Sequence, residues 1–156
     1  MLILQCNLAD TYESFGHLEK ALRMERDVYS GYLTLFGEDD EGTLYAANNY
    51  ALSLCNLERF EEAKSLLRRM MPVARRVLGE GNAITLDMRS NYAEALCRDD
   101  GATLNDLREA VTTLEETERT MRRVFGGAHP TTVDIGECLQ ESRATLRAHE
   151  TPASSA

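Results

Sequence analysis

The chain has 156 residues, a net charge of −9 and 43% hydrophobic residues. This length fits one domain, which buries roughly 68–70% of the surface of its unfolded chain. The acidic balance argues against a general nucleic-acid or anionic-membrane binder, because both functions need a basic surface. No apolar run approaches the ~20 residues of a membrane-spanning helix, and the apolar opening at Met1–Leu4 is too short for a signal peptide. We therefore expect a cytoplasmic protein.

The sequence repeats itself with a period of 42 residues. Asn7 is followed at this interval by Asn49 and Asn91, and Gly37 is followed by Gly79. Internal matches of this regularity are the signature of a repeat array. They predict a single domain over residues 1–150 with a disordered tail at 150–156. The expected parts of the domain are repeats at about 1–42, 43–84 and 85–131 and a capping helix at 131–149.

Apolar residues at helical spacing, separated by turn residues, predict an all-α protein of about seven helices. Gly37 and Gly79 each follow a second helix directly, which suits the left-handed conformation of a helix cap. Pro72 lies inside one expected helix and predicts a kink rather than a break. The expected helices are 1–14, His17–Phe36, Thr43–Asn56, Arg59–Leu78, Ala83–Arg98, Leu104–Phe125 and Thr131–His149.

The period changes once, within the third pair of helices. Ala63 and Gly79 recur as Ala110 and Gly126, at an offset of 47 residues. Five residues are therefore inserted near Asp99–Thr103, and an insertion in a surface turn costs little free energy. The insertion either narrows a neighbouring binding groove or is neutral.

The four cysteines are widely spaced and form no C-x-x-C pair. Cys55 and Cys97 are one period apart, and Cys138 occupies a position where the earlier repeats carry Asn. Terminal repeats are often atypical in this way. For all four, including Cys6, small reduced thiols explain the spacing better than disulfides or a metal site.

The paired helices resemble the tetratricopeptide repeat. The period, the cores Asn-Tyr-Ala and Asn-Leu-Ala, and the ending Gly-x-x-His-Pro-x-Thr resemble its kinesin-light-chain subgroup, best at 78–85 and 125–132. The resemblance covers residues 1–135 and implies a right-handed α-solenoid of antiparallel helix pairs. Because the chain starts in mid-motif, we expect a fragment or a shortened relative of larger repeat proteins. Small residues stand at the close-packing positions, namely Ala9, Ala51 and Ala93 in first helices and Ala21, Ala63 and Ala110 in second helices.

The resemblance implies that the first helices line a concave groove. On the helix Thr43–Asn56 one stripe of residues is apolar and suits packing, while a second, largely polar stripe suits a ligand. The Asn that recurs once per repeat offers donors and an acceptor to a peptide backbone, a role that kinesin light chains imply. The alternative is that each Asn bonds its own neighbouring helix. The candidate groove residues are Asn7, Asp10, Tyr45, Asn48, Asn49, Leu52, Asp87, Asn91, Glu94 and Arg98.

The charges near this groove indicate the kind of ligand. Asp10, Asp87 and Glu94 favour a neutral or basic partner, in contrast to the basic groove of kinesin light chains. Chaperone-type arrays hold an acidic C-terminus with Lys or Arg beside the Asn positions, and such residues are missing here. Arginines on the second helices predict a solvated convex face, with an acidic partner as the alternative, namely at Arg68, Arg69, Arg75, Arg76, Arg119, Arg122 and Arg123.

No residue pattern indicates catalysis. His17, His129 and His149 are scattered, no His/Cys/carboxylate grouping has a metal-ligand spacing, and no Gly-rich phosphate loop follows a strand. The sequence therefore predicts a non-enzymatic adaptor that uses no cofactor or metal and binds an extended peptide or partner segment. The alternative is a structural spacer that associates end to end through its apolar N-terminal residues 2–4 and holds no groove ligand. An accessory domain of an enzyme is a third possibility.

Overall fold

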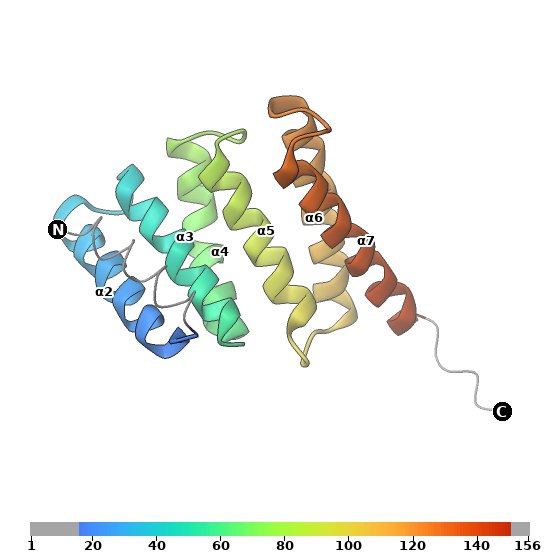
Figure 1. Ribbon diagram of the computed structural model, residues 1–156, viewed down its shortest axis with the longest axis horizontal. Helices are drawn as coiled ribbons and strands as arrows, with labels where there is room; N and C mark the ends of the chain where they lie inside the picture. Colours follow the sequence, from blue (N-terminus) through green and yellow to red (C-terminus); the bar gives the residue numbers. More distant parts are fainter. Residues whose placement is uncertain (1–15, 151–156) are drawn as a thin grey trace.

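The computed structural model describes residues 16–150, which form six α-helices and no β-strand (Figure 1). The predicted all-α class is confirmed. The first expected helix and the C-terminal tail lie outside the described residues. The helices are α2 (Leu18–Phe36), α3 (Glu41–Asn56), α4 (Phe60–Val77), α5 (Ala83–Arg98), α6 (Leu104–Val124) and α7 (Pro130–Glu150).

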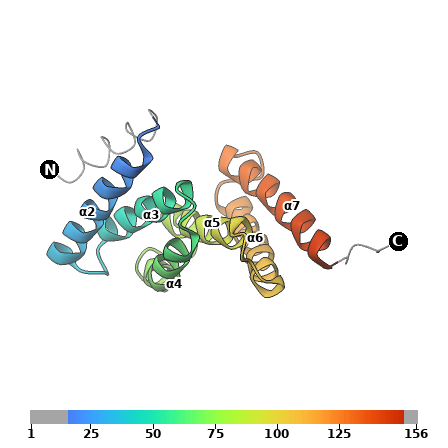
Figure 2. The ribbon, with the colours of Figure 1, turned by 90° about the horizontal axis from the view of Figure 1, so that it is seen from below.

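The helices stack in chain order, and each packs against the next. In addition, α3 packs against α5 and α5 touches α7, whereas no comparable contact joins α4 and α6. Figure 2 shows α4 and α6 on one side of the array and α3, α5 and α7 on the other. The first helices of the repeats therefore contact one another more than the second helices do. This difference curves the array, so that α3, α5 and α7 line its concave side. This is the predicted α-solenoid.

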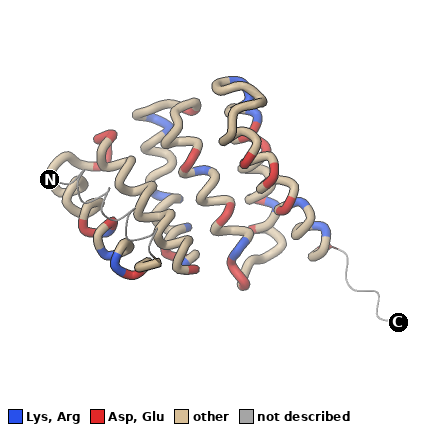
Figure 3. Tube along the Cα trace, in the orientation of Figure 1, with Lys and Arg blue, Asp and Glu red and all other residues tan. Residues whose placement is uncertain are grey.

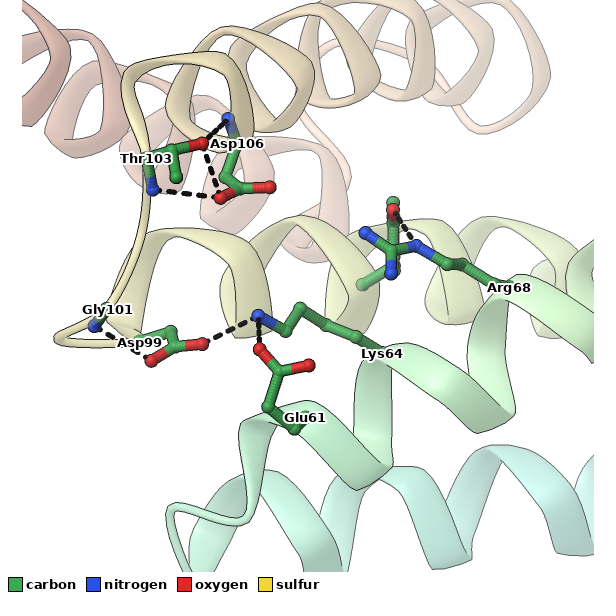
Figure 4. Close-up of polar contacts among 8 residues, drawn as sticks. Glu61, Lys64, Arg68, Asp99, Gly101, Thr103 and Asp106 are labelled. Atoms are coloured by element: carbon green, nitrogen blue, oxygen red, sulfur yellow. Dashed lines mark hydrogen bonds and ion pairs between the residues drawn. The ribbon is translucent and has the colours of Figure 1, made fainter.

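Local side-chain chemistry determines where the helices begin. Asp40 accepts a hydrogen bond from the backbone N–H of Thr43 at 2.9 Å and so caps α3. Thr103 and Asp106 form a reciprocal capping box at the start of α6 (Figure 4). Both arrangements satisfy backbone N–H groups that have no partner inside the helix.

Glycines determine where the second helices end. Gly37, Gly79 and Gly126 have φ angles of 84°, 94° and 90°, in the left-handed region that favours glycine. Gly37 and Gly79 thus have the positive φ expected of them, although Gly37, with a ψ of −178°, is not in the left-handed helical conformation. Glu58 has a φ of 59° and is the one non-glycine residue with positive φ in the described part of the chain. The helix α4 runs through Pro72 without a break.

Small residues allow the helices to approach closely. The repeated alanines at Ala51, Ala63, Ala93 and Ala110 are all fully buried. Between them lie large aliphatic side chains such as Leu67, which is also inaccessible to solvent. The core is thus continuous along the array, and the outward stripe of each first helix is available for other contacts.

The inserted turn after α5 is tied to α4. The Lys64 Nζ lies 2.6 Å from Asp99 Oδ2 and 2.5 Å from Glu61 Oε1, and the Gly101 N–H donates to Asp99 Oδ1 (Figure 4). Burial acts to lower the pKa of Lys64, but the hydrogen bonds to Asp99 and Glu61 outweigh it, so the pKa is raised. The same pair lowers the pKa of Asp99. The turn is therefore held by a charged contact.

Candidate functional site

A cavity of about 260 Å³ lies on the side of the array that α3, α5 and α7 line. Side chains from α3, α5 and α7 form its walls, and α6 supplies its floor. Here α5 and α7 have little direct contact, because both pack mainly against α6. It is lined by Asn48, Leu52, Asp87, Ser90, Asn91, Glu94, Leu114, Met121, Thr131, Asp134, Ile135 and Cys138.

The walls carry equivalent positions of successive first helices. Asp87 on α5 and Asp134 on α7 are 47 residues apart and correspond to one repeat position. Asn91 and Cys138 are related by the same offset. The cavity therefore displays one carboxylate from each of two neighbouring helices, because the repeat places them at matching heights along the array.

Two carboxamides meet at the wall shared by α3 and α5. The Asn91 Nδ2 donates a hydrogen bond to Asn48 Oδ1 at 3.0 Å. Asn48 is only 8% exposed, yet its own amide nitrogen makes no hydrogen bond within the described residues. Each carboxamide has two N–H donors and an acceptor, so the pair keeps the Asn48 Nδ2 donors and the Asn91 Oδ1 acceptor for another group.

The lining carries negative charge only. It includes the carboxylates of Asp87, Glu94 and Asp134 and no Lys, Arg or His. Acidic residues occur along both α5 and α7 in Figure 3. Burial raises the pKa of Asp87, because its charged form is partly removed from water. Glu94 accepts a hydrogen bond from Arg98 at 2.6 Å, on the outer edge of α5.

The floor of the cavity is apolar. Leu114 and Met121 on α6 are 0% and 1% exposed, and Ile135 on α7 is 4% exposed. Cys138 lies at the same junction, and burial raises the pKa of its thiol, so that it stays protonated near neutral pH. The cavity thus combines an apolar floor with acidic walls.

Five of the predicted groove residues line this cavity: Asn48, Leu52, Asp87, Asn91 and Glu94. Tyr45, Asn49 and Arg98 do not line it. Tyr45 is 47% exposed, and Arg98 turns to Glu94 and to the face of the Phe60 ring, 5.4 Å from its centroid. Asn7 and Asp10 lie outside the described residues, as do Cys6 and the apolar residues 2–4 predicted to self-associate.

Sequence reasoning missed several lining residues, above all Asp134. The signal was present, because Asp134 is the counterpart of Asp87 once the five-residue insertion is counted. Ser90 and Cys138 follow from the same alignment of first helices. The floor residues carry no such signal, because buried leucine and methionine on a second helix look like ordinary core.

A second cavity, of about 460 Å³, lies on the convex side between α4, α5 and α6. Its charges are paired with one another. Arg68 donates to the Tyr92 hydroxyl at 2.8 Å, and Tyr92 donates to Glu109 at 2.7 Å. Arg89 contacts Glu116 at 2.6 Å. These contacts join all three helices that form this convex cleft.

The arginines predicted on the convex face are exposed on α4 and α6. Most of them have partners. Arg76 contacts Asp39 at 2.6 Å and Arg122 contacts Glu118 at 2.7 Å, while Arg75 forms an ion pair with Glu80. Much of the positive charge of this face is therefore neutralised within the chain.

Residues 16–150 contain no cluster of His, Cys, Asp or Glu side chains that could hold a metal ion. Within the same residues, every helix is too short or too polar to cross a bilayer. Burial raises the pKa of the Cys55 thiol to about 11 and also raises that of Cys97.

Comparison with known proteins identifies the repeat. Residues 43–84 match the model of the tetratricopeptide repeat. The fold is similar to a crystal structure of nearly identical tetratricopeptide-like repeats, from a Podospora anserina protein described as a kinesin light chain. The TM-score is 0.83 at 18% identity, and the match covers 92% of this chain and 66% of that chain.

A crystal structure of BtubC (BKLC) from P. vanneervenii is also similar, with a TM-score of 0.69 at 16% identity. This match covers 99% of the present chain and 68% of the other. Comparison with curated proteins gave no match. At these identities the solved structures establish the fold alone.

Proposed function

We propose that this chain, a tetratricopeptide-repeat array of the kinesin-light-chain type, binds an extended peptide segment of a partner protein in its concave groove. A protein-interaction role suits the fold in general. The finer assignment to the groove rests on the Asn48–Asn91 pair. Buried polar groups normally find partners, and here a donor and an acceptor remain at the surface of a cavity.

This donor and acceptor match the needs of a peptide backbone. Each peptide unit presents one N–H and one C=O. The C=O can accept from Asn48 Nδ2 while an N–H donates to Asn91 Oδ1, and the first hydrogen bond between the two carboxamides stays intact. Side-chain selection would then come from the neighbouring Leu52 and from the acidic walls. The partner is therefore a neutral to basic peptide.

The role we propose is that of a non-enzymatic adaptor in the cytoplasm. Paired charges on the convex cleft leave little there for an acidic ligand. The groove by contrast has unpaired polar groups and an apolar floor, which are the ingredients of a peptide site.

The test is a peptide-display selection with the wild type and with an Asn48→Ala, Asn91→Ala double variant. Both residues are changed because a single change would leave one buried carboxamide without its partner. We expect a shared motif that binds the wild type and loses about tenfold or more in affinity in the double variant, as for two lost hydrogen bonds.

The matched control is Asn56→Ala, which removes an exposed carboxamide at the end of α3, outside the cavity. It should bind as the wild type does. Circular dichroism would verify that each variant is folded. If no motif is enriched, or if the double variant binds normally, the groove is not the site and the spacer function becomes the better explanation.

A further inference from the structure

We propose that the cleft between α5 and α7 is a subsite for one arginine side chain of the bound peptide. The proposal rests on the peptide-binding function above and specifies what the groove selects. Its starting point is the pair Asp87 and Asp134, which the repeat places at one height on neighbouring helices. Neither carboxylate has an ion-pair partner within the described residues.

Acidic residues alone would not define a site, but the cavity wall contains a second, independent sign of a ligand. Asn48 lines the cavity and is 8% exposed, and its Oδ1 accepts from Asn91 while no hydrogen bond of its amide nitrogen is found within residues 16–150. A carboxamide nitrogen carries two N–H donors, and one at a cavity wall can donate to a ligand. A peptide carbonyl at this point would satisfy it and would fix the backbone beside the cleft.

The volume of the cavity and its apolar lining favour one long side chain of the peptide as the occupant. A cleft of about 260 Å³ has room for one extended side chain. The methylene groups of arginine would pack against Leu52, the most exposed apolar residue of the lining, as long basic side chains do on apolar surfaces.

The headgroup must contact two separate carboxylates. A guanidinium has five N–H donors in a planar fork and can bridge Asp87 and Asp134, whereas an ammonium is a compact point charge. Arginine is also more weakly hydrated and enters a partly buried site at less cost. No cation of the chain itself lines the cavity, so the subsite has no internal competitor.

The test uses a peptide from the display selection, synthesised with arginine, lysine or citrulline at the position that the selection fixes. Citrulline keeps the shape of arginine and removes its charge. We expect affinity to fall by about tenfold or more from arginine to citrulline, as for a lost charged hydrogen bond, with lysine between them. In Asp87→Asn and in Asp134→Asn the preference for arginine over citrulline should largely disappear.

The control is Asp100→Asn, which makes the same change in net charge at an exposed residue outside the cavity. It should keep the full arginine preference. Equal losses in Asp87→Asn and Asp100→Asn would mean that only long-range attraction acts, and the subsite would be wrong. The same conclusion holds if the wild type binds the arginine and citrulline peptides equally well.

These outcomes separate the two proposals. If arginine and citrulline bind equally but the Asn48→Ala, Asn91→Ala variant loses both, the groove function stands and the arginine subsite fails. If the selected motif is acidic, the subsite also fails. If no peptide is selected at all, both proposals are overturned together.

Discussion

The convex cleft and the concave groove each contain three carboxylates, but they differ in pairing, because Asp87 and Asp134 of the groove have no ion-pair partner within the described residues. The convex cleft contains three arginines and three glutamates, and the concave groove contains three acids and no base. The convex cleft is also the larger, at about 460 Å³ against 260 Å³. Volume and charge content alone would therefore favour the convex cleft, whereas the proposed function places the ligand in the groove. The decisive difference is whether the polar groups already have partners.

The pairing of charged groups has opposite consequences for ligand binding on the convex and concave faces. On the convex side a ligand must first displace Arg68 from Tyr92 or Arg89 from Glu116, and so loses the contacts that join α4, α5 and α6. On the concave side Asp87 is partly desolvated without compensation, which raises its pKa. A cation in the groove would remove this cost. The convex network thus contributes to stability, whereas Asp87 in the groove remains available to a cationic ligand.

The largest expected effect distinguishes the floor of the groove from its rim. Leu114 is fully buried, so Leu114→Ala should lower the free energy of unfolding by about 2–5 kcal/mol through lost burial and the cavity left behind. Leu52 lies on the rim and is 37% exposed, so Leu52→Ala should cost less than about 1 kcal/mol. Urea unfolding would measure both. Equal effects would mean that the floor is not part of the core.

The next effect tests the pairing on the convex side. The side chain of Arg89 is only 17% exposed and contacts Glu80 and Glu116. Arg89→Met keeps much of the volume and removes the charge, and should lower stability by about 1–3 kcal/mol because Glu116 loses its partner, while Glu80 keeps Arg75. Peptide binding in the groove should be unchanged. A loss of binding without loss of stability would assign the convex cleft a ligand role.

The smallest effect has the opposite sign and concerns Asp87. Burial raises its pKa in the folded state above that of the unfolded chain, so the folded protein binds the proton more tightly. The carboxylate therefore destabilises the fold at neutral pH, and this cost disappears as the pH falls below the unfolded pKa. Asp87→Asn should raise stability at pH 7 by less than about 1 kcal/mol.

The gain from Asp87→Asn should shrink as the pH is lowered to about 3, below the usual range of aspartate pKa values. Thermal unfolding between pH 7 and pH 3 measures it, with Asp100→Asn as the exposed control. A destabilised Asp87→Asn protein would show that Asp87 has an internal role. A stabilised protein that binds arginine peptides less well would directly separate function from stability at this residue.

The fold was predictable because its signals are local and recur. Gly37, Gly79 and Gly126 mark helix ends, and buried alanines such as Ala51 mark the close contacts. Each signal depends on backbone conformation or on the size of one side chain. Errors in helix bounds were small for the same reason. The division of residues 1–150 into repeats and a capping helix stays a prediction.

The site was less predictable because it depends on how neighbouring repeats are offset. The recurring asparagines suggested that Asn49 and Asn91 form one row, yet Asn91 pairs with Asn48 across the helix boundary. Asp134 was overlooked because the insertion shifts it from the 42-residue period. Arg98, a candidate groove residue, contacts Glu94 and the face of the Phe60 ring and does not itself line the cavity. Tertiary contacts determine which side chains line the cavity, and the 42-residue period of the sequence does not encode these contacts.

Lys64 makes the middle repeat difficult to exchange for one of its neighbours. Its repeat counterparts are Leu22 and Val111, both buried, whereas Lys64 is a 4%-exposed cation whose head contacts the inserted turn at Asp99. Deleting the turn, or exchanging this repeat with a neighbour, would remove Asp99 and leave Glu61 as the remaining charged partner of this poorly exposed ammonium group, which is costly. Anyone who shortens, shuffles or extends this array must therefore move the turn and Lys64 together, or replace Lys64 with leucine.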